Sequence, residues 1–327
     1  MARSIHSERV DFVNKVNESI WSGRVDHTED RSSFRYHQVV EIADIEKVSG
    51  GCTIIGFECE EGVRRNKGRL GAAVAPNALR SGLAPLPWRF PEIARLFDVS
   101  NIVCDGEDLE SAQQQLGEAV SAILLKGSKP IILGGGHETL YGHYLGVRES
   151  LGNEATLGIV NIDAHFDLRP YDEQPSSGTM FRQILEQDPN AHYFVAGIQR
   201  YGNTQELFNR ADLLGVTYVM EDEMIPGQLE GLMASLEDFM NEHDAVMLTL
   251  CTDVVNAAFA SGVSATSPFG LDPSTVRSII RKVVEHEKTR SFDICEVNPA
   301  LDENGRTVKL GAYFVNEAIA SFMSKLG

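Results

Sequence analysis

Hydrophobic positions along the chain fall into short, nearly continuous runs that alternate with longer amphipathic stretches. A run rich in Val, Ile, Leu and Phe is typical of a parallel strand that is buried on both faces. Eight runs predict strands: Cys52–Phe57, Asn101–Cys104, Pro130–Leu133, Leu157–Ile162, Tyr193–Ile198, Val216–Val219, Val246–Leu250 and Phe292–Val297. Helical spacing of apolar residues predicts helices at Leu109–Leu125, Leu140–Ser150, Gln205–Leu214, Leu229–Asn241, Pro273–His286 and Ala312–Lys325.

This alternation determines the expected architecture. Strands that alternate with helices imply right-handed crossovers and a parallel sheet that is covered on both faces. We therefore expect an α/β fold, a three-layer αβα sandwich around a parallel sheet of about eight strands. Neither a Pro/Gly/Ser-rich linker nor an internal repeat interrupts the pattern, so residues 1–327 are expected to form a single domain. Residues 1–45 are the least patterned, and we expect a surface extension there.

Composition and charge exclude several classes of protein. The 327 residues are 43% hydrophobic and 23% charged, which is ordinary for a globular protein and excludes disorder. The chain has 29 Lys and Arg against 47 Asp and Glu, a net charge of −18, and it shows no basic stripe, so we expect no nucleic-acid partner. It has no apolar stretch of roughly 18 residues and no apolar region typical of a secretory signal, so we expect no membrane association.

The cysteines indicate the cellular compartment. They are Cys52, Cys59, Cys104, Cys251 and Cys295. Their number is odd, they are widely spaced, and none forms a CxxC pair, so the sequence indicates neither a zinc ribbon nor a secreted disulfide framework. We therefore expect a cytoplasmic protein.

Chemically active residues follow four of the predicted strands. In an open parallel sheet, ligands bind beyond the carboxyl ends of the strands, so the residues just after each run carry the most information. Six candidates occupy these positions: His137, Asp163, His165, Asp167, Asp253 and Glu296. We expect them to meet at one rim of the sheet.

The segment Asp163-Ala164-His165-Phe166-Asp167 is the most informative of these. Alternate positions on an extended segment point the same way, so both carboxylates and the imidazole can converge on one point. A set of carboxylates and imidazoles suits Mn²⁺ or another borderline divalent ion. A single Asp here would be better explained as a helix cap. Asp-x-His-x-Asp at one strand end, with a second His at another, favours a metal site.

The glycines Gly134-Gly135-Gly136 before His137 have two explanations. A Gly-rich turn after a strand can bind the pyrophosphate of a dinucleotide at a helix N-terminus. A GxGxxG pattern that starts at Gly134 would place Thr139 at its last position, so the dinucleotide fingerprint fails. We expect instead that the glycines let the backbone pass close under the cluster and present His137 to it.

Four motifs together resemble a known family. They are Gly134-Gly135-Gly136-His137, the Asp-x-His-x-Asp segment, the region Gly262-Val263-Ser264-Ala265 and Glu296-Val297-Asn298-Pro299. Their order and spacing, from about Gly56 to the C-terminus, resemble the ureohydrolase (arginase/agmatinase) superfamily. Within it, the charged stretch from Glu61 to Arg69 and the segments around Arg169 and Ser177 are most similar to the formimidoylglutamase branch. On its own, the stretch from Glu61 to Arg69 would be read as a solvated loop.

The resemblance implies an arginase-like fold, a hydrolytic activity and two Mn²⁺ ions. It implies ligand roles for His137 and Asp167 at one ion and for His165 and Asp253 at the other, with Asp163 between the two ions. Ions of this kind lower the pKa of bound water, and the implied reaction converts N-formimidoyl-L-glutamate to L-glutamate and formamide, in L-histidine degradation. Glu296 is implied to orient the amidine-like group, and Arg169 and Ser177 to contact the amino-acid end of the substrate. Homo-oligomers are common in the superfamily, so self-association is implied as well.

One position departs from the family pattern. The family shows Asp-x-Asp where this chain has Cys251-Thr252-Asp253, and the first Asp bridges both ions. A thiolate is soft and Mn²⁺ prefers oxygen ligands, so we expect Cys251 to be a weak bridging ligand. Three outcomes are open: a weakened but active site, a preference for a softer ion such as Zn²⁺, or loss of catalysis.

Two further hypotheses follow from the resemblance. The loop of Cys59 lies near the active site in relatives, so a disulfide between Cys59 and Cys251 could close the metal site; two unpaired thiols are the alternative in a cytoplasmic setting. For function, the alternatives to formimidoylglutamate hydrolysis are a ureohydrolase that acts on a guanidino substrate and a non-catalytic binding protein with the same fold.

Overall fold

A single parallel sheet forms the centre of the molecule. The computed structural model describes residues 13–14, 17–172 and 174–324. In this part of the chain ten strands form one sheet in the order β1-β4-β3-β5-β10-β9-β6-β7-β8, with β2 paired to β4. Strands β2 to β10 run parallel, and β1 is antiparallel to β4. The strands are β1 Val13–Asn14, β2 Glu41–Ile42, β3 Cys52–Glu58, β4 Leu96–Val103, β5 Lys129–Leu133, β6 Leu157–Ile162, β7 Ala191–Ile198, β8 Thr217–Met220, β9 Ala245–Cys251 and β10 Thr289–Cys295.

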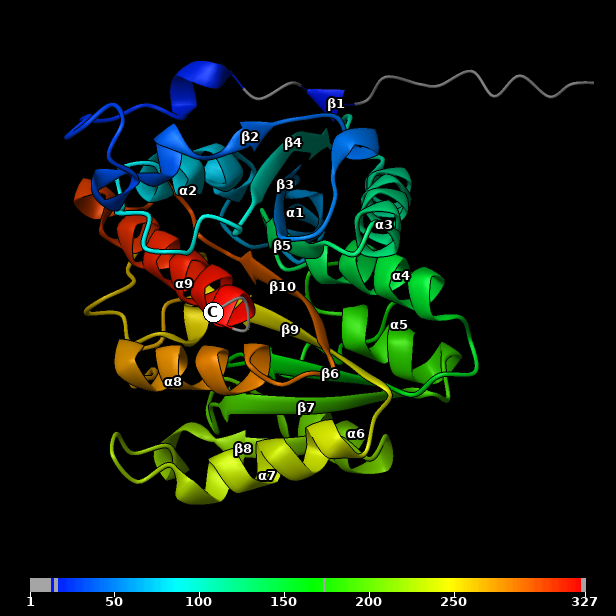
Figure 1. Cartoon of the computed structure of the whole chain (residues 1–327). Coiled ribbons are helices and arrows are strands. Elements are labelled where there is room, and N and C mark those ends of the chain that lie inside the picture. Colours follow the sequence, from blue (N-terminus) through cyan, green and yellow to red (C-terminus); the bar gives the residue numbers. More distant parts are fainter. Residues whose placement is uncertain (1–12, 15–16, 173, 325–327) are drawn as a thin grey trace, which may run out of the picture.

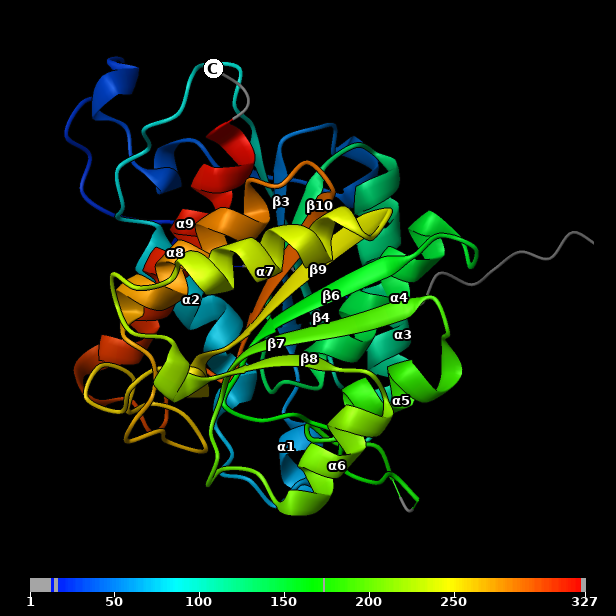
Figure 2. The ribbon, with the colours of Figure 1, turned by 90° about the horizontal axis from the view of Figure 1, so that it is seen from below.

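The helices cover both faces of this sheet, which confirms the three-layer αβα architecture (Figures 1 and 2). They are α1 Glu61–Arg65, α2 Ala75–Leu83, α3 Leu109–Leu125, α4 Thr139–Leu151, α5 Met180–Gln187, α6 Gln205–Leu213, α7 Glu230–Asn241, α8 Pro273–Val284 and α9 Arg306–Met323. Apolar side chains of α2, α7, α8 and α9 pack in one core, and those of α3, α4, α5 and α6 in a second core on the other face. The two cores explain why the central strands are apolar on both sides.

The eight predicted strands correspond to β3 through β10. Their bounds agree to within two residues except for β10, which spans Thr289–Cys295 rather than Phe292–Val297, and for β4, which begins at Leu96 rather than at Asn101. The reason in β4 is a buried ion pair: Arg80 donates to Asp98 at 2.7 Å and to Asn101 at 2.6 Å, and the Arg80 side chain is 0% exposed. These polar groups satisfy each other in the interior, and Asp98 interrupts the apolar run that would otherwise have predicted the first half of the strand.

Six of the helices were predicted and three were not. Helix α3 has the predicted bounds, whereas α9 begins at Arg306 rather than Ala312, and Lys325 lies outside the described residues. The short helices α1, α2 and α5 carry many polar residues and were not recognised. Two of them flank the site described below, since α1 follows β3 and α5 follows the segment around Ser177.

The N-terminal segment is more deeply packed than a surface extension implies. Tyr36 is 0% exposed and its hydroxyl group donates to Asn316, on α9. Trp21 is also buried, and its Nε1 donates to Asp98 at 2.7 Å. Residues 1–12 and 15–16 of this segment lie outside the described residues.

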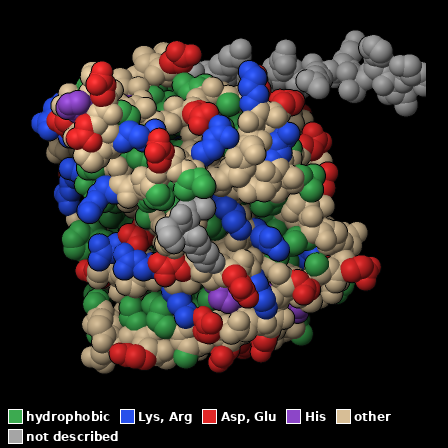
Figure 3. All heavy atoms as spheres, viewed as in Figure 1, with side chains coloured by type: hydrophobic (Ala, Val, Ile, Leu, Met, Phe, Trp, Pro, Cys, Tyr) green, Lys and Arg blue, Asp and Glu red, His purple; other side chains and the backbone are tan. Residues whose placement is uncertain are grey.

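The surface carries charged side chains of both signs. On the face seen in Figure 3, acidic and basic groups are interspersed over the helices. None of the helices described is long and apolar enough to cross a membrane.

Candidate active site

The order of the central strands brings the candidate residues together. Strands β5, β10, β9 and β6 are neighbours in the sheet, and their carboxyl ends meet at one edge. His137 comes shortly after β5, Glu296 directly follows β10, Cys251 ends β9 and Asp163 directly follows β6. Residues as far as 159 positions apart in the chain, His137 and Glu296, therefore contribute to one place.

Asp163 lies at the centre of the cluster. Its Oδ2 is 3.1 Å from Nδ1 of His137, and its Oδ1 is 3.5 Å from Nδ1 of His165. The Asp163 carboxylate, which is 0% exposed, thus presents one oxygen to each imidazole. Two further carboxylates flank the pair: Oδ2 of Asp167 lies 2.9 Å from Nδ1 of His137, and Oδ2 of Asp253 lies 3.2 Å from Nδ1 of His165. The arrangement has two halves that share Asp163.

Two sets of potential ligands can be drawn from these residues. One set is His137, Asp163 and Cys251, and the other is Asp163, His165 and Asp253; within each set the ligand atoms lie within 4.8 Å of one another. Asp163 belongs to both sets, as a bridging ligand would. Imidazole and carboxylate ligands suit Mn²⁺ and related ions, and Cys251 adds a soft ligand to the first set.

The buried charges of the cluster fit a bound cation. Oδ1 of Asp253 is buried and has no hydrogen-bond partner among the described residues. A buried carboxylate oxygen without a partner is costly, and a cation between Asp163, His165 and Asp253 would satisfy it. The donor set and this orphaned oxygen therefore agree with a metal site.

The carboxylates and imidazoles shift one another's pKa values. Burial alone would lower the pKa of His137, but Asp163 and Asp167 raise it well above its usual value. Burial likewise opposes the charged form of His165, and the charge of Asp253 with Asp163 raises its pKa. Burial acts against ionisation of Asp163, yet both imidazoles lower its pKa well below the usual range. The two imidazoles and the Asp163 carboxylate thus each favour the charged form of the other.

Glu296 stands apart from the two ligand sets. Its Oε1 accepts from the backbone N–H of His137 at 2.9 Å, and its own N–H donates to the carbonyl of Gly135 at 2.8 Å. Burial, followed by the charges of Glu138 and Asp253, raises the pKa of Glu296 to about 8. The carboxyl group is thus fixed at the pocket while Oε2 remains available.

Two site residues have backbone conformations that are unusual for residues with a side chain. Asp167 has φ of 51° and Glu296 has φ of 68°. Non-glycine residues in this left-handed region cost free energy and concentrate at functional sites. The strain aims both carboxylates at the pocket.

The glycines before His137 act through close approach. A Cβ on Gly135 would lie 1.9 Å from the carbonyl oxygen of Cys59, and one on Gly136 would lie 2.1 Å from Oε2 of Glu138. The backbone at Gly135 and Gly136 therefore lies too close to Cys59 and Glu138 for any residue with a side chain. This agrees with the role expected for these glycines.

One pocket collects nearly all the residues singled out in the sequence. It is lined by His137, His165, Asp167, Arg169, Ser177, Cys251, Asp253 and Glu296. Asp163 lies in contact with this lining, through His137 and His165. Ser177 is buried and Arg169 is exposed, so the pocket opens on the Arg169 side.

Three residues at the site were not among the candidates that the sequence supplied. Asn66 lines the pocket beside Ser177. Asn203 accepts from the N–H of Phe166 and donates to the carbonyl of Ala164, so it supports the Asp163–Asp167 segment. Glu138 is fully buried behind His137, and burial raises its pKa to about 7. The two asparagines lie in loops without a repeating pattern, and only the position of Glu138, next to His137, pointed to it.

The proposed disulfide between Cys59 and Cys251 is wrong for this structure. All five cysteines are free. The thiol of Cys59 instead contacts Cys104, because both residues directly follow paired positions of β3 and β4. Cys251 lines the pocket, and burial with the charge of Asp163 raises the pKa of its thiol well above the usual value.

Fold and site together define a class of protein. The model of the Arginase family matches residues 51–321, and the chain belongs to this family. The chain is 61% identical over 312 residues to the formimidoylglutamase of Lysinibacillus sphaericus, a match that covers 94% of this chain and 97% of the relative.

Solved structures have the same fold. The crystal structure of formimidoylglutamase from Bacillus subtilis matches with a TM-score of 0.79 at 20% identity, over 92% of this chain and 96% of that one. The structure of Trypanosoma cruzi formiminoglutamase with Mn²⁺ matches with a TM-score of 0.75 at 23% identity, over 84% of this chain and 94% of that one.

Proposed function

We propose that this protein hydrolyses N-formimidoyl-L-glutamate to L-glutamate and formamide, in L-histidine degradation. The observation that carries the proposal is the 61% identity to a formimidoylglutamase over 94% of the chain, joined with a pocket that contains two overlapping sets of metal ligands. The identity to a formimidoylglutamase speaks against a guanidino substrate, and the two sets of ligands retained among the described residues speak against a purely binding role.

The proposed cofactor is a pair of Mn²⁺ ions. His137, Asp163, Asp167 and Cys251 would hold one ion, and Asp163, His165 and Asp253 the other. Such ions lower the pKa of bound water and so supply a nucleophile near neutral pH. The structure of the Trypanosoma cruzi relative contains Mn²⁺, and the carboxylates and imidazoles of the present site suit this ion.

Glu296 would orient the formimidoyl group. Its Oε1 is fixed by the N–H of His137, which leaves Oε2 to accept from the N–H groups of the amidine. The amidine is cationic near neutral pH. Burial raises the pKa of Glu296 to about 8, and the nearby cation would oppose this effect and favour the ionised carboxylate. Arg169 and Ser177 would bind the glutamyl part, since both line the same pocket and can donate hydrogen bonds to a carboxylate.

Cys251 would weaken the first ion's site without preventing activity. A thiol whose pKa is raised by burial and by Asp163 must lose its proton before it binds a metal. The carboxylate found here in the family would bind Mn²⁺ without this cost. We therefore propose an active enzyme with reduced affinity for one of its two ions.

The test is a direct assay of formamide release. The purified protein, loaded with Mn²⁺, should release formamide and L-glutamate in equal amounts from N-formimidoyl-L-glutamate. It should release no urea from L-arginine or agmatine, which serve as control substrates. Absence of formamide release in excess Mn²⁺ would overturn the proposal. A cytoplasmic location and self-association stay predictions, which cell fractionation and light scattering can check.

A further inference from the structure

Helix α1 connects the metal side of the pocket to the substrate side. The N–H of Gly62 donates to Oε1 of Glu138 at 3.0 Å, directly behind His137. The carbonyl of the same Gly62 accepts from the N–H of Ser177 at 3.1 Å. A Cβ on Gly62 would lie 2.6 Å from the Cβ of Glu138, so this close approach requires glycine. The position of α1 is therefore fixed relative to both sides.

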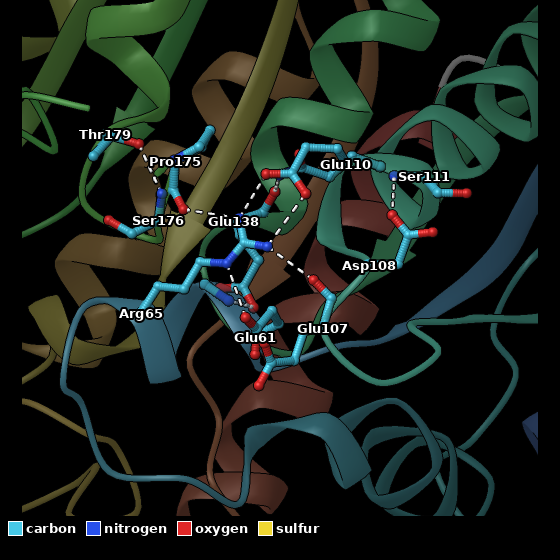
Figure 4. A network of polar contacts seen from close by, with 12 residues as sticks. Glu61, Arg65, Glu107, Asp108, Glu110, Ser111, Glu138, Pro175, Ser176 and Thr179 are labelled. Carbon is cyan, nitrogen blue, oxygen red and sulfur yellow. Dashed lines mark hydrogen bonds and ion pairs between the residues drawn. The ribbon is translucent and has the colours of Figure 1, made fainter. Parts of the chain in front are cut away.

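Arg65, the last residue of α1, joins three segments (Figure 4). Its Nε donates to Glu61 at 2.8 Å, and its Nη1 donates to Glu110 at 2.6 Å and to the carbonyl of Pro175 at 3.2 Å. Its Nη2 donates to the carbonyl of Glu107 at 2.8 Å and to Glu110 at 3.2 Å. These five contacts use every N–H of the guanidinium group. Arg65, whose side chain is 7% exposed, therefore positions its neighbours and has no donor left for a substrate.

Asn66 follows Arg65 and faces the pocket. Its Nδ2 donates to Oγ of Ser177 at 3.3 Å. Because an amide nitrogen carries two protons, a second N–H remains, and because Ser177 accepts here, its own hydroxyl proton also remains. A Cβ on Gly178 would lie 3.2 Å from Nδ2 of Asn66 and 2.9 Å from Cδ of Arg169, so all three residues meet.

Arg169 completes a group of unused donors. Among the described residues, no hydrogen bond or ion pair involves its guanidinium group, whereas its backbone N–H donates to the carbonyl of Gly178 at 2.9 Å. Asn66, Ser177 and Arg169 thus offer hydrogen-bond donors and one positive charge at one end of the pocket. Carboxylate oxygens are the acceptors that such a group binds best.

We propose that Asn66 is a specificity-determining residue, which binds a carboxylate of the glutamyl part of the substrate together with Ser177 and Arg169, and that Arg65 positions it. The inference rests on the proposed function and deepens it. It predicts that Asn66 contributes to substrate binding and not to the metal site.

The experiment measures steady-state kinetics of Mn²⁺-loaded Asn66→Ala and Asn66→Asp with N-formimidoyl-L-glutamate. Loss of a hydrogen bond to a charged group should raise KM about tenfold in Asn66→Ala, with kcat within about twofold. The added negative charge should raise KM further in Asn66→Asp. Asn153→Ala, at an exposed asparagine outside the pocket, is the matched control and should match the wild type. Bound Mn²⁺ should be the same in all four proteins.

Several results would overturn the inference. They are a KM for Asn66→Ala within twofold of the wild type, a fall in kcat at unchanged KM, and loss of bound Mn²⁺ in both Asn66 variants. Failure of the proposed function is distinguishable, because the wild type would then release no formamide. In that case calorimetric binding of L-glutamate decides: weaker binding by Asn66→Ala than by Asn153→Ala supports the carboxylate site, and equal binding overturns it.

Discussion

Oγ1 of Thr249 lies 3.1 Å from Nε2 of His137, on the side of the ring opposite to the acidic cluster. The hydroxyl group of Thr249 donates its hydrogen bond to Oδ1 of Asp293 at 2.7 Å, so Oγ1 of Thr249 can only accept from His137. This places a proton on Nε2, so when a metal ion displaces the other ring proton it is Nδ1, the atom that faces Asp163 and Asp167, that becomes free to bind it. A metal-binding histidine needs this tautomer, and partners of this kind fix it.

Replacing Thr249 should therefore weaken metal binding. Valine has nearly the same shape but cannot accept from Nε2 of His137, so Thr249→Val should raise the Mn²⁺ dissociation constant about 10- to 100-fold. Thr249→Ser retains the hydroxyl group and should bind Mn²⁺ nearly as the wild type does. Isothermal titration calorimetry on the metal-free proteins measures both. Equal affinities for the valine and serine variants would contradict this role.

Cys251→Asp should strengthen the same site. The substitution supplies the carboxylate that Mn²⁺ prefers and removes a thiol whose pKa burial raises. We expect more bound Mn²⁺ and faster formamide release, checked by metal analysis and by the activity assay. Cys104→Ser, at a partly buried cysteine outside the pocket, is the control. Equal Mn²⁺ and equal activity in the wild type and Cys251→Asp would refute this account of the thiol.

The stability of the metal-free protein should fall as the pH rises. Burial raises the pKa of Glu138 to about 7 and that of Glu296 to about 8, both above the ordinary value of 4.5. Between the ordinary pKa and the raised one, each carboxyl group keeps its proton in the folded protein but has lost it in the unfolded chain. The free energy of unfolding therefore decreases from about pH 5 to pH 8. His137 and His165, whose pKa values are also raised, add to the decrease above about pH 6.5.

Urea unfolding at several pH values, in the presence of a chelator, measures this dependence. Glu138→Gln keeps an acceptor for the N–H of Gly62 and removes the titrating group, so it should flatten the decrease. Saturating Mn²⁺ should have the opposite effect and stabilise the protein most at high pH, because binding releases protons. A Glu138→Gln variant with the same pH dependence as the wild type would rule out this source.

Arg65→Lys should affect both stability and substrate binding. Lysine has three donors on a single nitrogen and cannot reproduce the five contacts of the guanidinium group. We expect the free energy of unfolding to fall by about 1–3 kcal/mol and KM to rise several-fold, with bound Mn²⁺ unchanged. Chemical denaturation and steady-state kinetics measure these. Arg182→Lys, at a residue that pairs with Glu186 on its own helix, should change little.

All five cysteines should react as free thiols. A thiol-specific reagent in denaturant should titrate five groups, with or without a reductant. Fewer groups before reduction than after it would indicate a disulfide, contrary to the contacts of Cys59 and Cys251 in the structure.

The sequence predicted the sheet well because its central strands are buried on both faces. The exceptions share a physical cause. Arg80 and Asp98 are fully buried but satisfy each other, so charged residues interrupt the apolar pattern of α2 and of the first half of β4. On its own pattern, helix α1 would be taken for a solvated loop, yet Glu61 is 5% exposed because it pairs with Arg64 and Arg65. A pattern of single residues cannot reveal groups that are buried in pairs.

For the site, strand ends were a sufficient guide to the acidic and imidazole residues, which meet at one rim as expected; their roles as ligands stay predictions. Asn66, Asn203 and Thr249 could not be found in this way. Asn66 and Asn203 belong to loops whose path depends on tertiary contacts, and Thr249 is an ordinary strand residue until Asp293 is placed beside it. Such partners become visible only when the sheet order is known.

Because β5, β10, β9 and β6 come from distant parts of the chain, the proposed metal site depends on assembly of the whole sheet. The ligand-bearing segments are joined only through the finished sheet, so a partly folded molecule or a fragment lacks a complete site. A ligand that binds the native state alone raises the free energy of unfolding by RT ln(1 + [L]/Kd). A rise of the unfolding temperature with Mn²⁺ concentration would therefore show that these strands have assembled into the complete sheet.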